Sequence, residues 1–333
     1  MSDADQIPPS PQPSPDSSAA RETPHAAPAA GSVLPPSIVH EEASFSAPPP
    51  QGVLPGSVLP GQPAPLPPRQ LPPEIRYANL PPALRVPWNW LDIFLLVLFS
   101  IAALLVMSVG FALIYGFTGH DPRALNPASP QMIYFAVILQ AILDAMILAY
   151  MLGLMRWRYD RPPWRALGWE PLPEGKLGRG SMVMGLIFGG ILLSFVVAGA
   201  SQLFPPKTEL PVEQIMHDHR AAILFMLMAV LVAPVVEETL FRGFLYPVAA
   251  RSFGVPAGIV ITGTLFGLMH ASQLSGGPWL VVLIIFVGCV FTWIRAKTNT
   301  VLASFIVHTA YNGIQVVGLL VATHGLTKAI PHP

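Results

Sequence analysis

The sequence predicts an all-α protein: a polytopic membrane helix bundle of about seven transmembrane helices, preceded by a disordered, Pro-rich N-terminal tail. Of the 333 residues, 52% are hydrophobic and 11% are charged, and this charged share is less than half of the roughly 25% typical of soluble domains. From residue 88 onward, apolar segments recur that have the roughly 20 residues a helix needs to cross a bilayer. No alternation of apolar and polar residues repeats over many segments, which argues against transmembrane strands.

Residues 1–87 differ in composition from the rest of the chain. They hold 23 of the 39 prolines, a density at which neither helix nor sheet propagates and extended conformations are expected. We therefore predict a disordered tail over 1–87, with a ligand for Pro-binding modules as the alternative, and a transmembrane helical domain over 88–325. The tail has no basic stretch followed by an apolar stretch, so we do not expect a secretory signal peptide.

The apolar segments predict where the helices lie. The expected spans are 91–116, 132–155, 180–203, 221–250, 256–273, 279–296 and 300–322. The fourth span is longer than a crossing requires and contains Pro234, so we expect a kink there. Four tryptophans flank spans, as expected of an aromatic belt at the membrane surface: Trp88, Trp90, Trp157 and Trp279.

Charge and cysteine usage set the orientation and exclude other classes of protein. With the N-terminus in the cytoplasm, thirteen Lys and Arg near the spans fall inside and four fall outside, as the positive-inside rule requires. We thus expect an integral membrane protein in the lipid bilayer with a cytoplasmic N-terminus; a bacterial plasma (inner) membrane is a separate expectation that the charge count does not test. The net charge of zero gives no sign of a nucleic-acid partner. A single cysteine, Cys289, excludes a disulfide framework and a thiolate metal site.

Polar and ionisable residues inside the later spans are the candidate functional residues, because such groups are costly in a bilayer and usually functional. At 1.5 Å per residue, Glu237 lies about 24 Å from the outer end of its predicted span, and His270 and His308 lie about 21 and 12 Å from the cytoplasmic ends of theirs. These depths allow the side chains to converge in one site. The full candidate set is Glu237, Glu238, Arg242, His270, His308 and Asn312.

The spacing of these residues indicates what each could do. Glu238 and Arg242 are four residues apart, so they share a helix face and can pair. Glu237 lies about 100° around the same helix, which leaves its carboxylate free to face a cavity as a general base. His308 and Asn312 are also four residues apart and, with His270, could hold a metal ion or bind a water and a developing oxyanion directly.

Simpler interpretations exist for each residue taken alone. A histidine in a membrane helix often only hydrogen-bonds a neighbouring helix, and we interpret Asp144 and Gln140 in the second span in that way. A glutamate pair near a helix end is often an interfacial charge. The conjunction of two carboxylates, a paired arginine, two histidines and an asparagine at matched depth favours one polar site.

Three motifs resemble those of a known family. Glu237-Glu238-Thr-Leu-Phe-Arg242 looks like the EExxxR motif of the CPBP intramembrane proteases, which include the type II CAAX prenyl endopeptidases and the Abi proteins. Phe266-Gly-Leu-Met-His270 looks like the FxxxH motif of that family, and His308-Thr-Ala-Tyr-Asn312 like its HxxxN motif. The motifs occur in the family order, and the resemblance covers about 222–318.

The resemblance implies an intramembrane endopeptidase that hydrolyses a peptide bond in a membrane-associated protein or peptide. Glu237 would activate the water, and Glu238 and Arg242 would orient it and the substrate. His270, His308 and Asn312 would stabilise the oxyanion or bind a divalent metal such as zinc, and the sequence leaves open whether a metal is used. The alternatives are a non-catalytic membrane scaffold or immunity protein with the same fold, and a small transporter.

Overall fold

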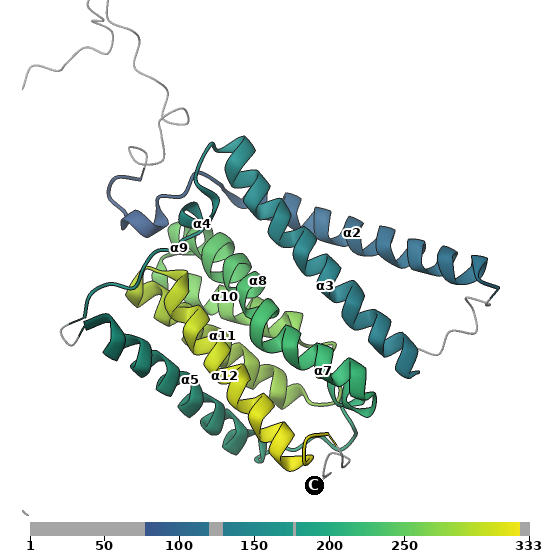
Figure 1. Ribbon diagram of the computed structural model, residues 1–333. Coiled ribbons are helices and arrows are strands. Elements are labelled where there is room, and N and C mark those ends of the chain that lie inside the picture. Colours follow the sequence, from purple (N-terminus) through teal and green to yellow (C-terminus); the bar gives the residue numbers. More distant parts are fainter. Residues whose placement is uncertain (1–76, 120–128, 176–177, 327–333) are drawn as a thin grey trace, which may run out of the picture. The chain divides into compact units, whose positions relative to one another are not determined.

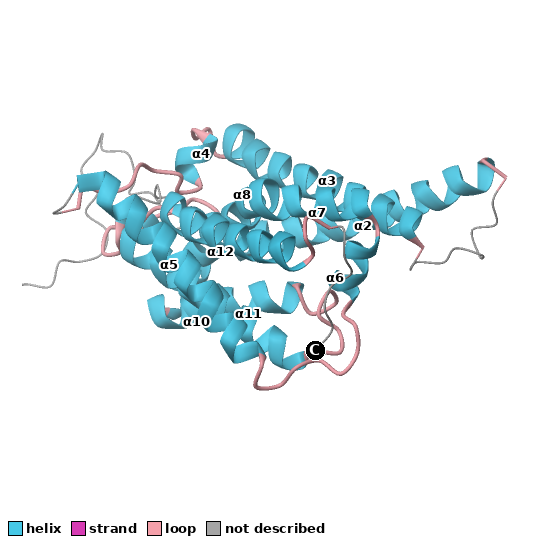
Figure 2. Cartoon of the chain, turned by 60° about the horizontal axis from the view of Figure 1, so that its bottom comes forward, coloured by secondary structure: helices cyan, strands magenta, loops and turns pink. Residues whose placement is uncertain are grey.

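The computed structural model describes residues 77–119, 129–175 and 178–326. Most of the predicted tail, residues 1–76, lies outside the described residues. The described part consists of helices joined by loops, without a strand among its residues (Figures 1 and 2). This confirms the all-α class.

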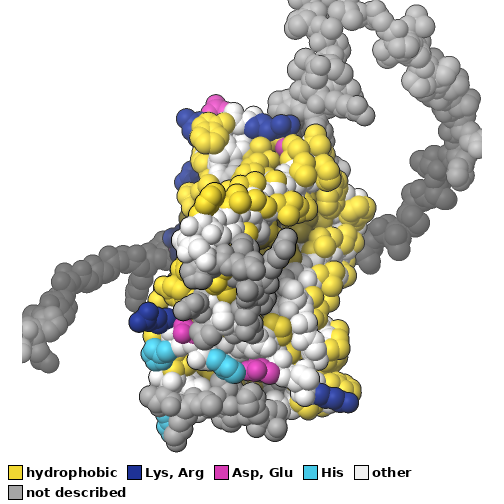
Figure 3. Space-filling model, turned by 90° about the vertical axis from the view of Figure 1, so that its right-hand side faces the viewer, with side chains coloured by type: hydrophobic (Ala, Val, Ile, Leu, Met, Phe, Trp, Pro, Cys, Tyr) yellow, Lys and Arg dark blue, Asp and Glu magenta, His cyan; other side chains and the backbone are white. Residues whose placement is uncertain are grey.

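Within the described residues, six helical runs are long and apolar enough to cross a membrane. Hydrophobic side chains cover much of the face shown in Figure 3, and charged side chains gather mainly towards its two ends. These runs are α2 (Trp90–Phe117), α3 (Pro130–Gly153) with η4 (Leu154–Arg158), α5 (Gly178–Ser201), His219–Phe253, α11 (Pro278–Thr298) and α12 (Val301–Ala322). They correspond to six of the seven expected spans.

The fifth expected span, 256–273, is shorter than predicted. Helix α10 comprises Val255–Met269, which is 15 residues, or about 22 Å against a hydrocarbon thickness of about 30 Å. The helix ends before His270, whose backbone forms the C-cap and leads into a turn. The prediction was wrong at this end because it extended the helix through residues 270–273, which are His-Ala-Ser-Gln and form a turn.

Residues 77–87, which we assigned to the tail, pack against the helical domain. Leu84, in the short helix η2 (Pro82–Leu84), is buried with Tyr246 of helix α9 (Tyr246–Phe253). Arg251 donates hydrogen bonds to the carbonyl of Val86 at 2.7 Å and to that of Trp88 at 2.8 Å. The folded domain therefore begins at least ten residues earlier than the sequence predicts.

Trp88 is a core residue and not a member of an aromatic belt. Its side chain is fully buried and stacks on Phe244 at a centroid distance of 5.5 Å. Its indole Nε1 donates to the carbonyl of Phe244 at 2.8 Å. Trp157, in contrast, is 86% exposed, as a residue facing lipid headgroups should be.

The start of α2 is fixed to the end of the α3 run by a buried carboxylate. Asp92 closes the capping box of α2 by accepting from the Asn89 amide at 2.9 Å. The same carboxylate accepts from the Tyr159 hydroxyl at 2.7 Å. Burial, together with this hydrogen bond, raises the pKa of Tyr159 to about 12. The phenol thus stays protonated and holds the two helix ends together.

Small residues let the helices around the candidate site approach closely. A Cβ added to Gly263 of α10 would lie 2.5 Å from the backbone nitrogen of Cys289 in α11, and one on Gly267 would lie 2.7 Å from that of Ile285. A Cβ on Gly190 of α5 would collide with the carbonyl of Val307 in α12, and Figure 1 shows α5 and α12 side by side. Close backbone contact of this kind is typical of helices packed in membranes, and here it fixes the helices that carry His270 and His308.

Candidate active site

The run His219–Phe253 contains two π-helical segments on either side of Pro234. Helix α7 (His219–Leu227) leads into η6 (Met228–Val232), and the short helix α8 (Ala233–Glu237) leads into η7 (Glu238–Leu245). In the first segment the Ala233 amide bonds the carbonyl of Met228, five residues back. Such π turns widen a helix and often occur at functional sites. The sequence predicted a kink near Pro234, and the structure has these two π-helical segments there.

Asn312 completes the backbone hydrogen bonding of this widened turn. In the π register, the next donor after Ala233 would be Pro234, bonding Ala229, but proline has no N–H. Asn312 of α12 supplies the missing donor, because its Nδ2 lies 2.7 Å from the carbonyl oxygen of Ala229. The sequence suggested a role for Asn312 in chemistry and did not reveal this structural one.

Glu238 and Arg242 form the ion pair that their spacing predicts. Both side chains are fully buried, and Arg242 Nη1 lies 3.0 Å from Glu238 Oε1. Arg242 also donates from Nη2 to the carbonyl of Gly288 at 2.9 Å and from Nε to Thr292 Oγ1 at 3.2 Å. The ring of Phe266 lies 4.5 Å from the guanidinium carbon, a distance at which a ring face stabilises a cation. The arginine is therefore held between η7, α10 and α11.

Glu238 in turn orients His308. The Nδ1 atom of His308 lies 2.9 Å from Glu238 Oε1. Because an ionised carboxylate only accepts hydrogen bonds, Nδ1 carries the proton. The opposite nitrogen, Nε2, faces Glu237, at 3.8 Å from its Oε2. Arg242, Glu238 and His308 thus form a buried chain that ends at Glu237.

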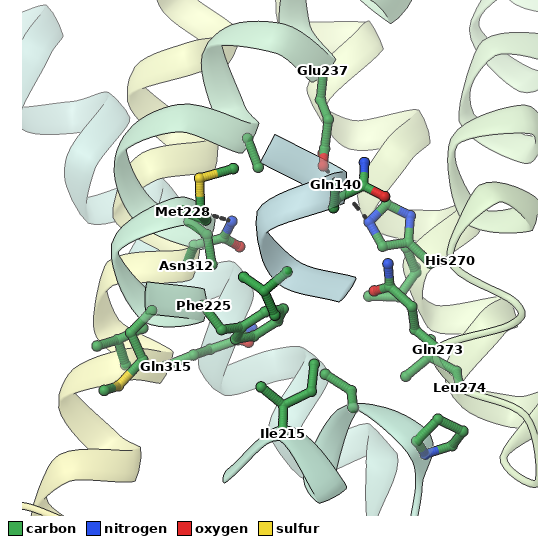
Figure 4. Close-up of a pocket in the computed structure, with 18 of the residues that line it drawn as sticks. Gln140, Ile215, Phe225, Met228, Glu237, His270, Gln273, Leu274, Asn312 and Gln315 are labelled. Atoms are coloured by element: carbon green, nitrogen blue, oxygen red, sulfur yellow. Dashed lines mark hydrogen bonds and ion pairs between the residues drawn. The ribbon is translucent and has the colours of Figure 1, made fainter. Parts of the chain in front are cut away.

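His270 reaches the same carboxylate from the other side. Its Nδ1 lies 2.8 Å from the carbonyl oxygen of Phe266, so this nitrogen also carries the proton. Its Nε2 lies 4.0 Å from Glu237 Oε1. Figure 4 shows Glu237 and His270 pointing into the same space. Separations of 3.8 and 4.0 Å are too long for direct hydrogen bonds and leave room for one bridging water.

These residues form one wall of a cavity of about 900 Å³ whose lining is mostly apolar. Glu238 and Arg242 are not in its lining; they lie behind the wall. Gln140 and Asp144 of α3 line the cavity, and Gln140 Nε2 donates to Asp144 Oδ1 at 2.7 Å. Figure 4 shows Gln140 beside Glu237 and His270. The sequence analysis treated these two α3 residues as helix-packing groups, although their position within a span was a signal for the site. The predicted residues that line the cavity are Glu237, His270, His308 and Asn312.

The donor set offers little for a tightly bound metal ion. Among the residues that the structure describes, no group of three or more His, Cys, Asp and Glu side chains is placed to hold a metal, whereas catalytic zinc usually has three protein ligands. Asn312, one of the predicted ligands, could offer a metal only its amide oxygen, which is a weaker ligand than imidazole or carboxylate. The residues therefore do not fit a resident zinc, and no step below depends on one.

The comparison with known proteins agrees with the motifs. Residues 219–314 match the family model described as type II CAAX prenyl endopeptidase Rce1-like. No curated protein and no solved structure matches the chain significantly. The matched segment contains all six candidate residues, from Glu237 to Asn312. The match confirms the resemblance to CPBP proteins, and it makes residues 219–314 of this chain similar to the type II CAAX prenyl endopeptidase family.

Proposed function

We propose that the protein is an intramembrane endopeptidase that uses a glutamate-activated water to hydrolyse a membrane-associated protein or peptide. One observation carries the proposal. The carboxylate of Glu237 faces Nε2 atoms of both His270 and His308 at the wall of a large, mostly apolar cavity. Each imidazole has its Nδ1 occupied by a separate acceptor. This arrangement supports a site in which one water is held between a base and two nitrogen acceptors.

The chemistry follows from these contacts. A water between the three groups gives one hydrogen bond to Glu237 and the other to an imidazole Nε2. Glu237 takes a proton as the water oxygen attacks the carbonyl carbon of the substrate, which forms a tetrahedral oxyanion. The second N–H of the Asn312 amide is the neutral donor we assign to that oxyanion. When the C–N bond breaks, Glu237 returns the proton to the leaving amine.

The cavity also supports a substrate class. Its lining is mostly apolar, with polar side chains near Glu237 and on α3, so an extended apolar peptide segment would bury its side chains while its scissile carbonyl meets the polar wall. The six apolar spans make the protein an integral membrane protein, and a segment lying in or on the bilayer would reach the site. A cytoplasmic N-terminus and a bacterial plasma membrane are part of this proposal.

The test is cleavage of an apolar peptide library by the purified protein in detergent, followed by mass spectrometry. For any peptide that the wild type cleaves, Glu237→Gln should lower the rate at least about 10²-fold, because it keeps the shape and removes the base. Glu174→Gln, at an exposed loop carboxylate, is the matched control and should cleave normally. Unchanged cleavage by Glu237→Gln would refute the assignment, and no cleavage by the wild type would favour the non-catalytic scaffold or immunity protein.

The same assay tests the metal. Because the ligand set is poor for a tightly held ion, chelation with EDTA should leave cleavage unchanged. Loss of cleavage on chelation and its return with added zinc, together with zinc that copurifies with the wild type but not with His270→Ala or His308→Ala, would show that the site uses a metal.

A further inference from the structure

A second cavity lies at the helix ends, apart from the candidate active site. Its volume is about 430 Å³, and it shares no lining residue with the larger cavity. Its walls come from the segment 82–87 before α2, the segment 161–170 that includes α4 (Pro163–Ala166), the start of α9, and the end of α11. Four arginines contribute to this lining: Arg85, Arg161, Arg165 and Arg295.

Arg295 is the unusual residue of this cavity. Its side chain is only 2% exposed, yet its Nε and Nη1 have no hydrogen-bond partner among the described residues. The ring of Tyr246 lies 6.0 Å from its guanidinium carbon, at the outer limit of a cation–π contact, and gives the N–H groups no acceptor. A guanidinium stays charged in proteins, and a buried charge normally has a partner of opposite charge. Arg295 therefore has the donors and the charge to bind an anion.

The charge of the cavity favours an anion from outside the chain. Arg165 is exposed at its rim, and Arg85 is held in place because its Nε and Nη2 donate to the carbonyls of Leu80 and Ala78. Glu170, which is exposed, is the only acidic residue among the lining residues that the structure describes. Arginines therefore outnumber carboxylates around a space that can hold a small group.

The position of the cavity and the arginine donors in its lining indicate which kind of anion it would bind. Arg85 precedes α2, Arg165 follows the α3 run, and Arg295 is three residues from the end of α11. The cavity thus lies at the ends of spans, where lipid headgroups meet water. The paired N–H donors of an arginine guanidinium group match the spacing of phosphate oxygens. Basic pockets between membrane helices bind anionic lipid headgroups. We propose that this cavity binds a phosphate group, namely that of an anionic phospholipid.

The binding test uses the full chain purified in a phosphate-free maltoside detergent. Thermal unfolding is followed while short-chain phosphatidylglycerol, short-chain phosphatidylcholine or inorganic phosphate is added. We expect phosphatidylglycerol to raise the unfolding midpoint in a saturable way, and the other two to raise it less at equal concentration. An equal or larger effect of inorganic phosphate would overturn the lipid as the source. If neither phosphatidylglycerol nor inorganic phosphate had a saturable effect, the site itself would be overturned.

Matched variants locate the site. Arg295→Gln should raise the half-saturating concentration of phosphatidylglycerol at least about tenfold, because it removes charged hydrogen bonds to the phosphate. Lys297→Gln removes the same charge from an exposed position on the same helix, outside the cavity lining, and should bind like the wild type. Equal weakening by both substitutions would mean attraction by general surface charge and would overturn the proposal.

Two exposed positions keep the test independent of folding. Arg165 lies at the rim of the cavity, so Arg165→Gln should weaken binding several-fold. This measurement does not depend on whether Arg295→Gln folds. Glu170→Gln removes the nearby negative charge and should strengthen binding. If Glu170→Gln instead lowered the unfolding midpoint of the ligand-free protein and left binding unchanged, Glu170 would be the partner of Arg295, and the phosphate site would be refuted.

Discussion

Two buried arginines near the same end of the helical bundle have opposite surroundings. Arg242 is fully buried and makes hydrogen bonds to Glu238, Thr292 and the carbonyl of Gly288. Arg295 is almost as buried but leaves two of its donor atoms without partners in the described part of the chain. The two arginines are similarly buried but differ in their hydrogen bonding, and this difference indicates that they have different roles. A buried arginine with protein partners stabilises the site around it, whereas a buried arginine without protein partners indicates a place where a ligand can bind.

The largest expected effect concerns this pair of arginines. Arg242→Met breaks a buried ion pair and leaves the Glu238 carboxylate uncompensated, so the free energy of unfolding should fall by about 3–5 kcal/mol. Arg295→Met removes an unpaired buried charge, so without phosphate ligands it should leave stability unchanged or raise it. Chemical unfolding of both variants in detergent makes the comparison. Similar destabilisation by both would mean that Arg295 is internally paired after all.

A smaller effect is expected where Asn312 compensates for Pro234. Asn312→Ala leaves the carbonyl of Ala229 without its donor and should cost about 1–3 kcal/mol of unfolding free energy. Pro234→Ala supplies the missing backbone N–H, so the double variant should be less destabilised than Asn312→Ala alone. A double-mutant cycle measures this coupling. Strictly additive effects would show that the amide–carbonyl bond does not replace the bond that proline lacks.

The smallest expected effect is at the N-terminus. The composition of the tail predicts that it takes no part in the packed fold, so deleting residues 2–76 should leave membrane insertion and the unfolding midpoint unchanged. Deleting residues 2–88 also removes the buried side chains of Leu84 and Trp88 and should lower the midpoint clearly. Insertion and thermal unfolding of both truncations test the boundary. A loss of stability in the shorter deletion would place part of the tail in the fold.

Local signals in the sequence predicted much of the candidate site. The four-residue spacing of Glu238 and Arg242 correctly predicted their pairing, because neighbours on one helix face are fixed by helix geometry alone. The depths of Glu237, His270 and His308 correctly predicted that they converge. Gln140 and Asp144 were not included, because a polar residue in a membrane helix can also hydrogen-bond a neighbouring helix, and the sequence does not tell which of the two it does.

By itself, the sequence determined the membrane class, the six long spans and the set of polar residues that must share a site, because length, hydropathy and helical spacing are local properties. Only the tertiary structure decided which partner each polar atom takes. It placed Glu238 behind His308, gave Asn312 the carbonyl of Ala229, buried Trp88 in the core and left Arg295 facing a basic cavity. These contacts join residues far apart in the chain, and they depend on close helix approach at glycines whose neighbours are set by packing, which local patterns do not encode.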